Sequence, residues 1–313
     1  MLFPPWASFD HKKHLLWKEI FWTHPDLLKT LIFAPYTFLV ITLTLFSCIK
    51  YNSLNIKSLI IETQFSGDRV VFADLSKDLL NLEIINKNWS RINSEKSMPY
   101  FRLKNNSGKI KGDFIYNAER YLIVQTNNGN LFKWKYNPIV SRSLPSHLAT
   151  LSAIEEAKLF IGKNIWLNEI HSDSIFINNS EKRFKKFDKV MVLGIRVFQN
   201  SKTDMPIWLE IDTNIEHNAF IRYNGKFKTE LRQNNYYKEN PLKKEWSKTI
   251  IENLKKKKIE YGMSFEQVRV SIGNPEIVNN TSSANGVSQQ WVYGKNLDEK
   301  KYLLFKNGKL VSM

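Results

Sequence analysis

One stretch of the chain is long and apolar enough to cross a membrane, and it constrains the rest most strongly. Between Lys29 and Lys50, the residues from Thr30 to Ile49 carry no charge. An apolar run of about twenty residues matches the hydrocarbon thickness of a bilayer when it is helical. Its densest part, Thr37 to Phe46, has the length of a signal-peptide apolar core instead. Residues 30–49 are therefore expected to be a signal peptide or a membrane anchor.

The end of this run suggests a lipid anchor. Leu45-Phe46-Ser47-Cys48 resembles a bacterial lipobox, in which a small residue precedes a cysteine that is lipidated and becomes the mature N-terminus. Cys48 is the only cysteine in the sequence, which excludes an intrachain disulfide framework. The alternative is that Cys48 is a small residue within a permanent span. If the run is a permanent span, residues 1–29 form a cytoplasmic tail. If the run ends in a lipobox, we expect translation to start later, near Leu27.

Composition narrows the choice of partner. The net charge is +16, which raises nucleic acid as a possibility because phosphate binding rests on clustered Lys and Arg. The basic residues are dispersed, however, and no DNA- or RNA-binding motif occurs. We therefore expect no nucleic acid partner. The charge favours anionic lipid headgroups or an acidic polymer near the membrane, or is simply a solvated basic surface.

Residues 58–136 carry the signals of a β-rich module. The clearest is a hairpin that joins Tyr121–Gln125 to Leu131–Tyr136 through Asn127-Asn128-Gly129, since Asn-Gly supplies the positive φ angles of a tight turn. The other expected strands are 58–63, 70–73, 82–85, 100–103 and 109–116. Asn137-Pro138 and Leu144-Pro145 then mark a linker.

Residues 150–225 are expected to form a helix followed by a small barrel-like module. Ser152 and Glu155 have the spacing of a capping box, and Gly162 is a suitable stop. Five short apolar runs follow with frequent turns, a pattern typical of a small barrel or sandwich. They are residues 164–169, 174–177, 189–198, 207–212 and 219–223.

The order of these runs resembles bacterial Src-homology-3-like domains over about residues 163–224. The resemblance rests on Phe187–Leu193, on Trp208-Leu209-Glu210-Ile211 and on Ala219-Phe220-Ile221. That family often binds peptidoglycan or peptides through aromatic residues between loops. The resemblance therefore nominates Trp166 and Trp208 as ligand-binding residues; the alternative is that both belong to the core.

Residues 241–313 contain two expected helices and a sheet. The first helix spans Leu242 to Ile259 behind Pro241, with an apolar stripe that includes Trp246 and Leu254. The second starts at Ser264, which forms a capping box with Gln267, and stops at Gly273 before Pro275. Met263 and Trp291 are expected in the core. Three antiparallel strands follow, at residues 290–293, 301–305 and 309–311.

This region resembles the small outer-membrane lipoproteins typified by BamE, also called SmpA or OmlA. The matching residues are Gly262, Met263, Ser264, Val268, Gly273, Pro275, Trp291, Tyr293, Phe305, Asn307, Gly308 and Leu310. The resemblance covers about residues 242–313 and implies a non-catalytic interaction module on an anchored envelope protein. Two further modules precede it here, unlike in the family, where this domain directly follows the anchor.

The sequence as a whole predicts an α+β protein of the bacterial cell envelope. Its parts are the membrane segment, two mainly β modules and a C-terminal domain of two helices and a three-stranded antiparallel sheet. Nucleophile, phosphate-loop and metal motifs are missing from it, so we expect no enzyme, no cofactor and no metal. The favoured function is a scaffold that binds other envelope proteins, with outer-membrane assembly or maintenance as the process it would serve. The alternative is peptidoglycan binding by the middle module.

Overall fold

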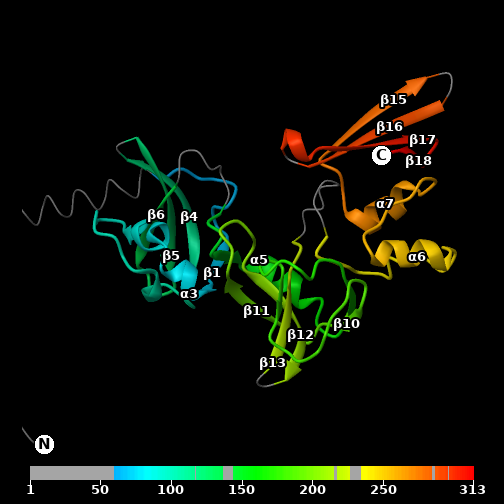
Figure 1. Ribbon diagram of the computed structural model, residues 1–313. Helices are drawn as coiled ribbons and strands as arrows, with labels where there is room; N and C mark the ends of the chain where they lie inside the picture. Colours follow the sequence, from blue (N-terminus) through cyan, green and yellow to red (C-terminus); the bar gives the residue numbers. More distant parts are fainter. Residues whose placement is uncertain are drawn as a thin grey trace, which may run out of the picture. The chain divides into compact units, whose positions relative to one another are not determined.

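The computed structural model describes residues 60–116, 118–136, 144–214, 217–225, 234–283, 286–294 and 296–313. The predicted tail, the membrane segment and Cys48 lie outside these residues, as does most of the predicted linker. The chain divides into two units, Met1–Ile60 and Ile61–Met313. The second is mainly β with few helices, and it contains two curled sheets shaped like half-barrels together with smaller sheets (Figure 1). Within the described ranges, no helix has the length and apolarity that a bilayer crossing needs.

The first sheet is six-stranded and antiparallel, in the order β3-β6-β5-β4-β1-β7. The predicted hairpin is confirmed: β5 and β6 pair directly, and Gly129 at their turn has a φ of +83°. Trp89, Leu122 and Trp134 are among the buried side chains that pack on one face of this sheet. Its strands are β1 (Arg69–Phe72), β3 (Trp89–Arg91), β4 (Ser107–Tyr116), β5 (Glu119–Thr126), β6 (Leu131–Lys135) and β7 (Leu148–Thr150).

Two predicted strands of this module are wrong, because they are helical. Residues 82–85 fall in a helical pair, α3 (Lys77–Leu80) and α4 (Glu83–Lys87), and residues 100–103 fall in the 3₁₀ turn Tyr100–Arg102. Runs of four apolar residues do not distinguish a strand from a helical turn. The predicted strand 58–63 is reduced, in its described part, to a single bridge between Ile61 and Asp113.

The second curled sheet has five strands in the order β2-β11-β12-β13-β9, beside a three-stranded sheet β10-β8-β14. Ile207, Leu209 and Ile221 belong to the core on one face of the larger sheet. Helix α5 contributes Ile154 and Ala157 to the same core. The elements are β2 (Asp74–Leu75), α5 (Leu151–Lys158), β8 (Asn164–Leu167), β9 (Phe176–Asn178), β10 (Lys189–Met191), β11 (Gly194–Gln199), β12 (Ile207–Asn214), β13 (His217–Arg222) and β14 (Tyr236–Tyr237).

Two details of the middle module differ from expectation. The predicted strand 189–198 is two strands, because Val192 donates its N–H to Lys163 while Leu193 donates to Glu210, so the chain crosses from one sheet to the other. The cap of α5 is Thr150 instead of Ser152: its hydroxyl accepts from the N–H of Ala153 at 3.3 Å.

The C-terminal part has two helices, α6 (Lys248–Lys255) and α7 (Phe265–Ile272), on the same face of an antiparallel sheet (Figure 1). The predicted capping box between Ser264 and Gln267 is confirmed. Met263 and Trp291 lie in the core as predicted, both fully buried.

The C-terminal sheet has four strands where three were predicted. The missed strand, β15 (Ile277–Ser283), is mostly polar and carries no alternating apolar pattern, so only its pairing with β16 (Gly286–Tyr293) reveals it. The other two are β17 (Lys301–Lys306) and β18 (Lys309–Ser312). The predicted first helix is also shorter than expected, because Ser247 caps it at residue 248.

Candidate functional site

The five-stranded sheet carries a hollow of about 480 Å³ on the face that points away from its apolar core. Side chains alternate along a strand, so Arg196 and Phe198 of β11 lie opposite to the core residues Ile195 and Val197. The hollow is lined by Ser76, Asp173, Ile177, Asn178, Asn179, Arg196, Phe198, Asn200, Trp208 and Phe220. It therefore combines aromatic rings, amides and charged groups in one concave surface.

Arg196 is the exposed cation of this hollow. Its guanidinium carbon lies 5.2 Å from the ring centroid of Phe198 and 5.7 Å from that of Phe220. Among the described residues, the Arg196 side chain has neither a hydrogen-bond partner nor an ion pair. Its planar fork of N–H donors is thus held over an aromatic surface and available to a carboxylate.

The rim is ordered by amide side chains. Asn178 donates to the carbonyl of Lys182 at 2.9 Å and accepts from the N–H of Ser180. Asn200 donates to the carbonyl of Asp173 at 2.7 Å. These bonds fix the two loops that border the hollow, so the site is preformed.

A second arginine, Arg222, supports the hollow from the same face of the sheet, as the cross-strand neighbour of Trp208. Arg222 is 1 % exposed and its guanidinium carbon lies 4.1 Å from the ring centroid of Trp208. It donates to the carbonyls of Ser174 and Met205 and to the side-chain oxygen of Asn200. Because it is buried and committed to these acceptors, Arg222 positions the walls and does not reach a ligand.

The two tryptophans nominated from the sequence lie in different sheets. Trp208 lines the hollow but is 1 % exposed, and its indole N–H donates to the carbonyl of Phe198 at 2.8 Å. Trp166 lies in β8, where Lys189 stacks over its ring at 5.7 Å. The structure does not bring them together in one site. Cys48, the nominated lipid attachment residue, lies outside the described residues.

Sequence reasoning missed Arg196, Phe198 and Phe220. An alternating pattern does predict a strand with one face in the core and one outside it, and it is present in Ile195-Arg196-Val197-Phe198. It does not reveal which residues of neighbouring strands join them, because that depends on register: Arg196 pairs with Trp208, and Phe220 with Ile177.

Comparisons with protein-family models, with curated proteins and with solved structures found no match to this chain. In the part of the chain that the structure describes, no three His, Cys, Asp or Glu side chains are grouped as metal ligands.

Proposed function

We propose that this chain is a non-catalytic binding protein of the bacterial cell envelope, held at the membrane through residues 30–49, and that its hollow binds peptidoglycan. The observation that supports this most directly is Arg196, a cation without a partner among the described side chains, stacked over aromatic rings in a concave site. Peptidoglycan presents sugar faces, acetamido groups and peptide carboxylates. Aromatic rings, amides and a guanidinium match these groups.

Retention of the full chain on purified peptidoglycan tests this function. Arg196→Ala removes the charge that meets a carboxylate, and we expect retention to weaken by about tenfold or more, the loss of a charge-assisted hydrogen bond. Trp208→Ala is a poorer probe because this buried ring supports the sheet, so its removal also disturbs folding.

The matched control is Lys189→Ala. It removes a cation of the same module that stacks on Trp166, away from the hollow. Equal losses from Arg196→Ala and Lys189→Ala would mean that the +16 charge binds the polymer unspecifically, and the proposal would then be wrong. If retention of the parent chain and of both variants disappears at moderate salt, binding is likewise unspecific and the proposal is wrong.

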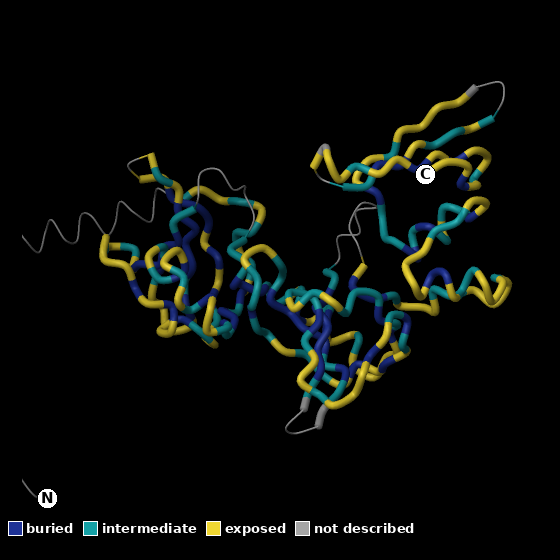
Figure 2. The backbone as a smooth tube through the Cα atoms, viewed as in Figure 1, coloured by how far each residue is buried: buried dark blue, intermediate teal, exposed yellow. Residues whose placement is uncertain are grey.

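A second candidate function is protein binding by the C-terminal sheet, in line with the resemblance of residues 242–313 to BamE. The supporting observation is an apolar row on the sheet face opposite to α6 and α7. Ile277, Val292 and Tyr302 lie in register across three strands; Ile277 and Tyr302 are 48 % and 51 % exposed, whereas Val292 between them is 4 % exposed. Leu304 is 40 % exposed on the same face. In the distal part of the β15–β16 hairpin, residues 279–282 of β15 are exposed, whereas β16 is mostly of intermediate burial there (Figure 2).

This row has basic neighbours. Lys306 and Lys309 pair across β17 and β18 and have no ion-pair partner within the described ranges. The chemistry fits a protein partner with an apolar centre and an acidic rim. We therefore propose an acidic envelope protein as the occupant of this face.

A further inference from the structure

A separate cavity of about 400 Å³ lies between the helical pair α3–α4, the end of β6, residues 144–147 and the loop 199–203. Its walls are mainly apolar side chains, and it shares no lining residue with the hollow described above. The apolar wall residues are chiefly Leu79, Leu82, Ile85, Trp134, Tyr136 and Leu144. Water is held poorly in a cavity with such walls, because it finds few polar partners there.

The deep end of this cavity is uncharged. His147 is 1 % exposed, and its ring centroid lies 4.7 Å from that of Trp134 and 5.0 Å from that of Tyr100. Its Nε2 accepts a hydrogen bond from the indole N–H of Trp89 at 2.9 Å, so the imidazole is neutral. Burial lowers the pKa of His147 to about 3, which is consistent with this assignment.

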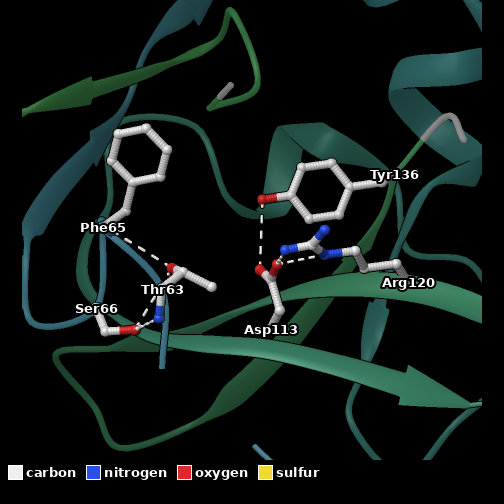
Figure 3. Close-up of polar contacts among 6 residues, drawn as sticks. All are labelled: Thr63, Phe65, Ser66, Asp113, Arg120 and Tyr136. Carbon is white, nitrogen blue, oxygen red and sulfur yellow. Dashed lines mark hydrogen bonds and ion pairs between the residues drawn. The ribbon is translucent and has the colours of Figure 1, made fainter. Parts of the chain in front are cut away.

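One wall is fixed by an ion pair behind it (Figure 3). The Tyr136 hydroxyl donates to Asp113 at 3.4 Å, and the guanidinium of Arg120 binds the same carboxylate. Arg120 also stacks on the Tyr136 ring at 5.7 Å. Because the polar end of Tyr136 is engaged by Asp113, its ring is left as a rigid apolar surface for the cavity.

The mouth combines apolar and basic groups. Ile84 is 49 % exposed at the opening, and Lys202 is exposed beside Ser201 and Thr203. Lys202 has no hydrogen bond or ion pair in the described part of the chain. The cavity thus has mainly apolar walls and two bordering cations: Lys135, which is paired with Glu119 at 2.9 Å, and Lys202 at the entrance, which has no such partner among the described residues.

We propose that this cavity binds the hydrocarbon chain of a single-chain amphiphile whose anionic head group contacts Lys202. A sugar or a peptide backbone would bury polar groups against walls that offer them few partners, which is unfavourable. An acyl chain has no polar groups that need hydrogen-bond partners, and its burial is driven by the hydrophobic effect. This inference is independent of peptidoglycan binding at the hollow.

Photolabelling tests the proposal. The full chain is placed in lipid nanodiscs with a fatty acid that carries a diazirine in the middle of its chain, and adducts are mapped by mass spectrometry. We expect adducts in residues 79–85, 134–136 and 144–147, suppressed by unlabelled palmitic acid. Leu144→Trp fills the cavity and should lower this labelling by about tenfold. Ile115→Trp, on an exposed position of β4, should leave it unchanged.

Lys202→Glu keeps the test decisive if the filled variant fails to fold, since Lys202 is a surface residue. It should weaken labelling by the fatty acid about threefold, as expected for an exposed ion pair, without affecting the corresponding fatty alcohol. Labelling confined to residues 30–49, or equal labelling of Leu144→Trp and Ile115→Trp, would overturn the proposal.

Discussion

His147 is the residue whose environment departs most from what its type suggests. Its imidazole is enclosed by Trp89, Tyr100 and Trp134 and accepts a hydrogen bond from Trp89. A buried imidazole avoids the charged form. The first β module therefore depends on a neutral histidine.

This burial predicts a loss of stability in acid. The pKa of His147 is about 3 in the folded chain, well below the usual value near 6.5. Between these values the unfolded chain binds the extra proton, so stability is complete above about pH 6.5 and falls as the pH drops. The expected loss is about 1.4 kcal/mol for each pH unit. Thermal unfolding of the full chain between pH 7 and pH 4, in one membrane mimetic, measures it.

His147→Gln is the informative variant, because a glutamine oxygen can accept from Trp89 without titrating. Its melting temperature should depend less on pH than that of the parent chain. His171→Gln, at an exposed position, should behave like the parent. An unchanged pH dependence in His147→Gln would assign the acid sensitivity to other groups.

Single residues with strong local chemistry were the most predictable part of the chain. Ser264 and Gln267 form the expected capping box, with the Ser264 N–H donating to Gln267 at 2.8 Å. A capping box needs only residues within one turn. Arg196, in contrast, belongs to the candidate site because it stacks on Phe220 of another strand. No local sequence pattern indicates this contact.

At the scale of elements, long and alternating strands were predicted well and short ones poorly. β4, β5 and β12 all match expected runs. α4 has five residues, too few for a helical period to show, and β15 is defined by its partner strand. Pairing with a neighbour thus determines what weak local preference does not.

The apolar row of the C-terminal sheet, with Tyr302 exposed in it, predicts a contact that crosslinking can detect. A photoreactive amino acid in place of Tyr302, in the full chain in cells, should give a discrete crosslinked product. Lys306→Glu with Lys309→Glu should lower its yield severalfold, because like charges then face the acidic rim of the partner.

Tyr261 provides the matched control position, since it is 64 % exposed in the same C-terminal part but lies outside the sheet. Equal yields from positions 261 and 302, or a product insensitive to the lysine changes, would argue against this docking face.

At the scale of the whole molecule, contacts join regions that the sequence presents as separate. β2 pairs in parallel with β11, and the N–H of Ser76 donates to the carbonyl of Gln199 at 2.9 Å. Lys186 donates to the carbonyls of Val270 and Ser271 at 2.9 and 2.7 Å, at the C-terminal end of α7, where a cation is favourable. The predicted domain boundaries stay a prediction.

Membrane attachment predicts a distinctive mass for the mature protein. If Cys48 is lipidated, the protein isolated from membranes should begin at Cys48 and carry acyl groups, and Cys48→Ala should stay unprocessed. Intact-mass spectrometry of both versions measures this. A mass that begins at Met1 and lacks lipid would instead make residues 30–49 a permanent span.

The sequence by itself determined the features that depend on neighbouring residues: the β5–β6 hairpin, the cap of α7, the mainly β character of the first two modules and the apolar run at residues 30–49. The tertiary structure alone decided the four-stranded C-terminal sheet, the buried His147 and both candidate binding sites. The physical reason is the distance along the sequence between the residues that interact. Turns and caps are stabilised by bonds within a few residues, whereas each cavity is lined by side chains from distant segments that only strand register and packing bring together.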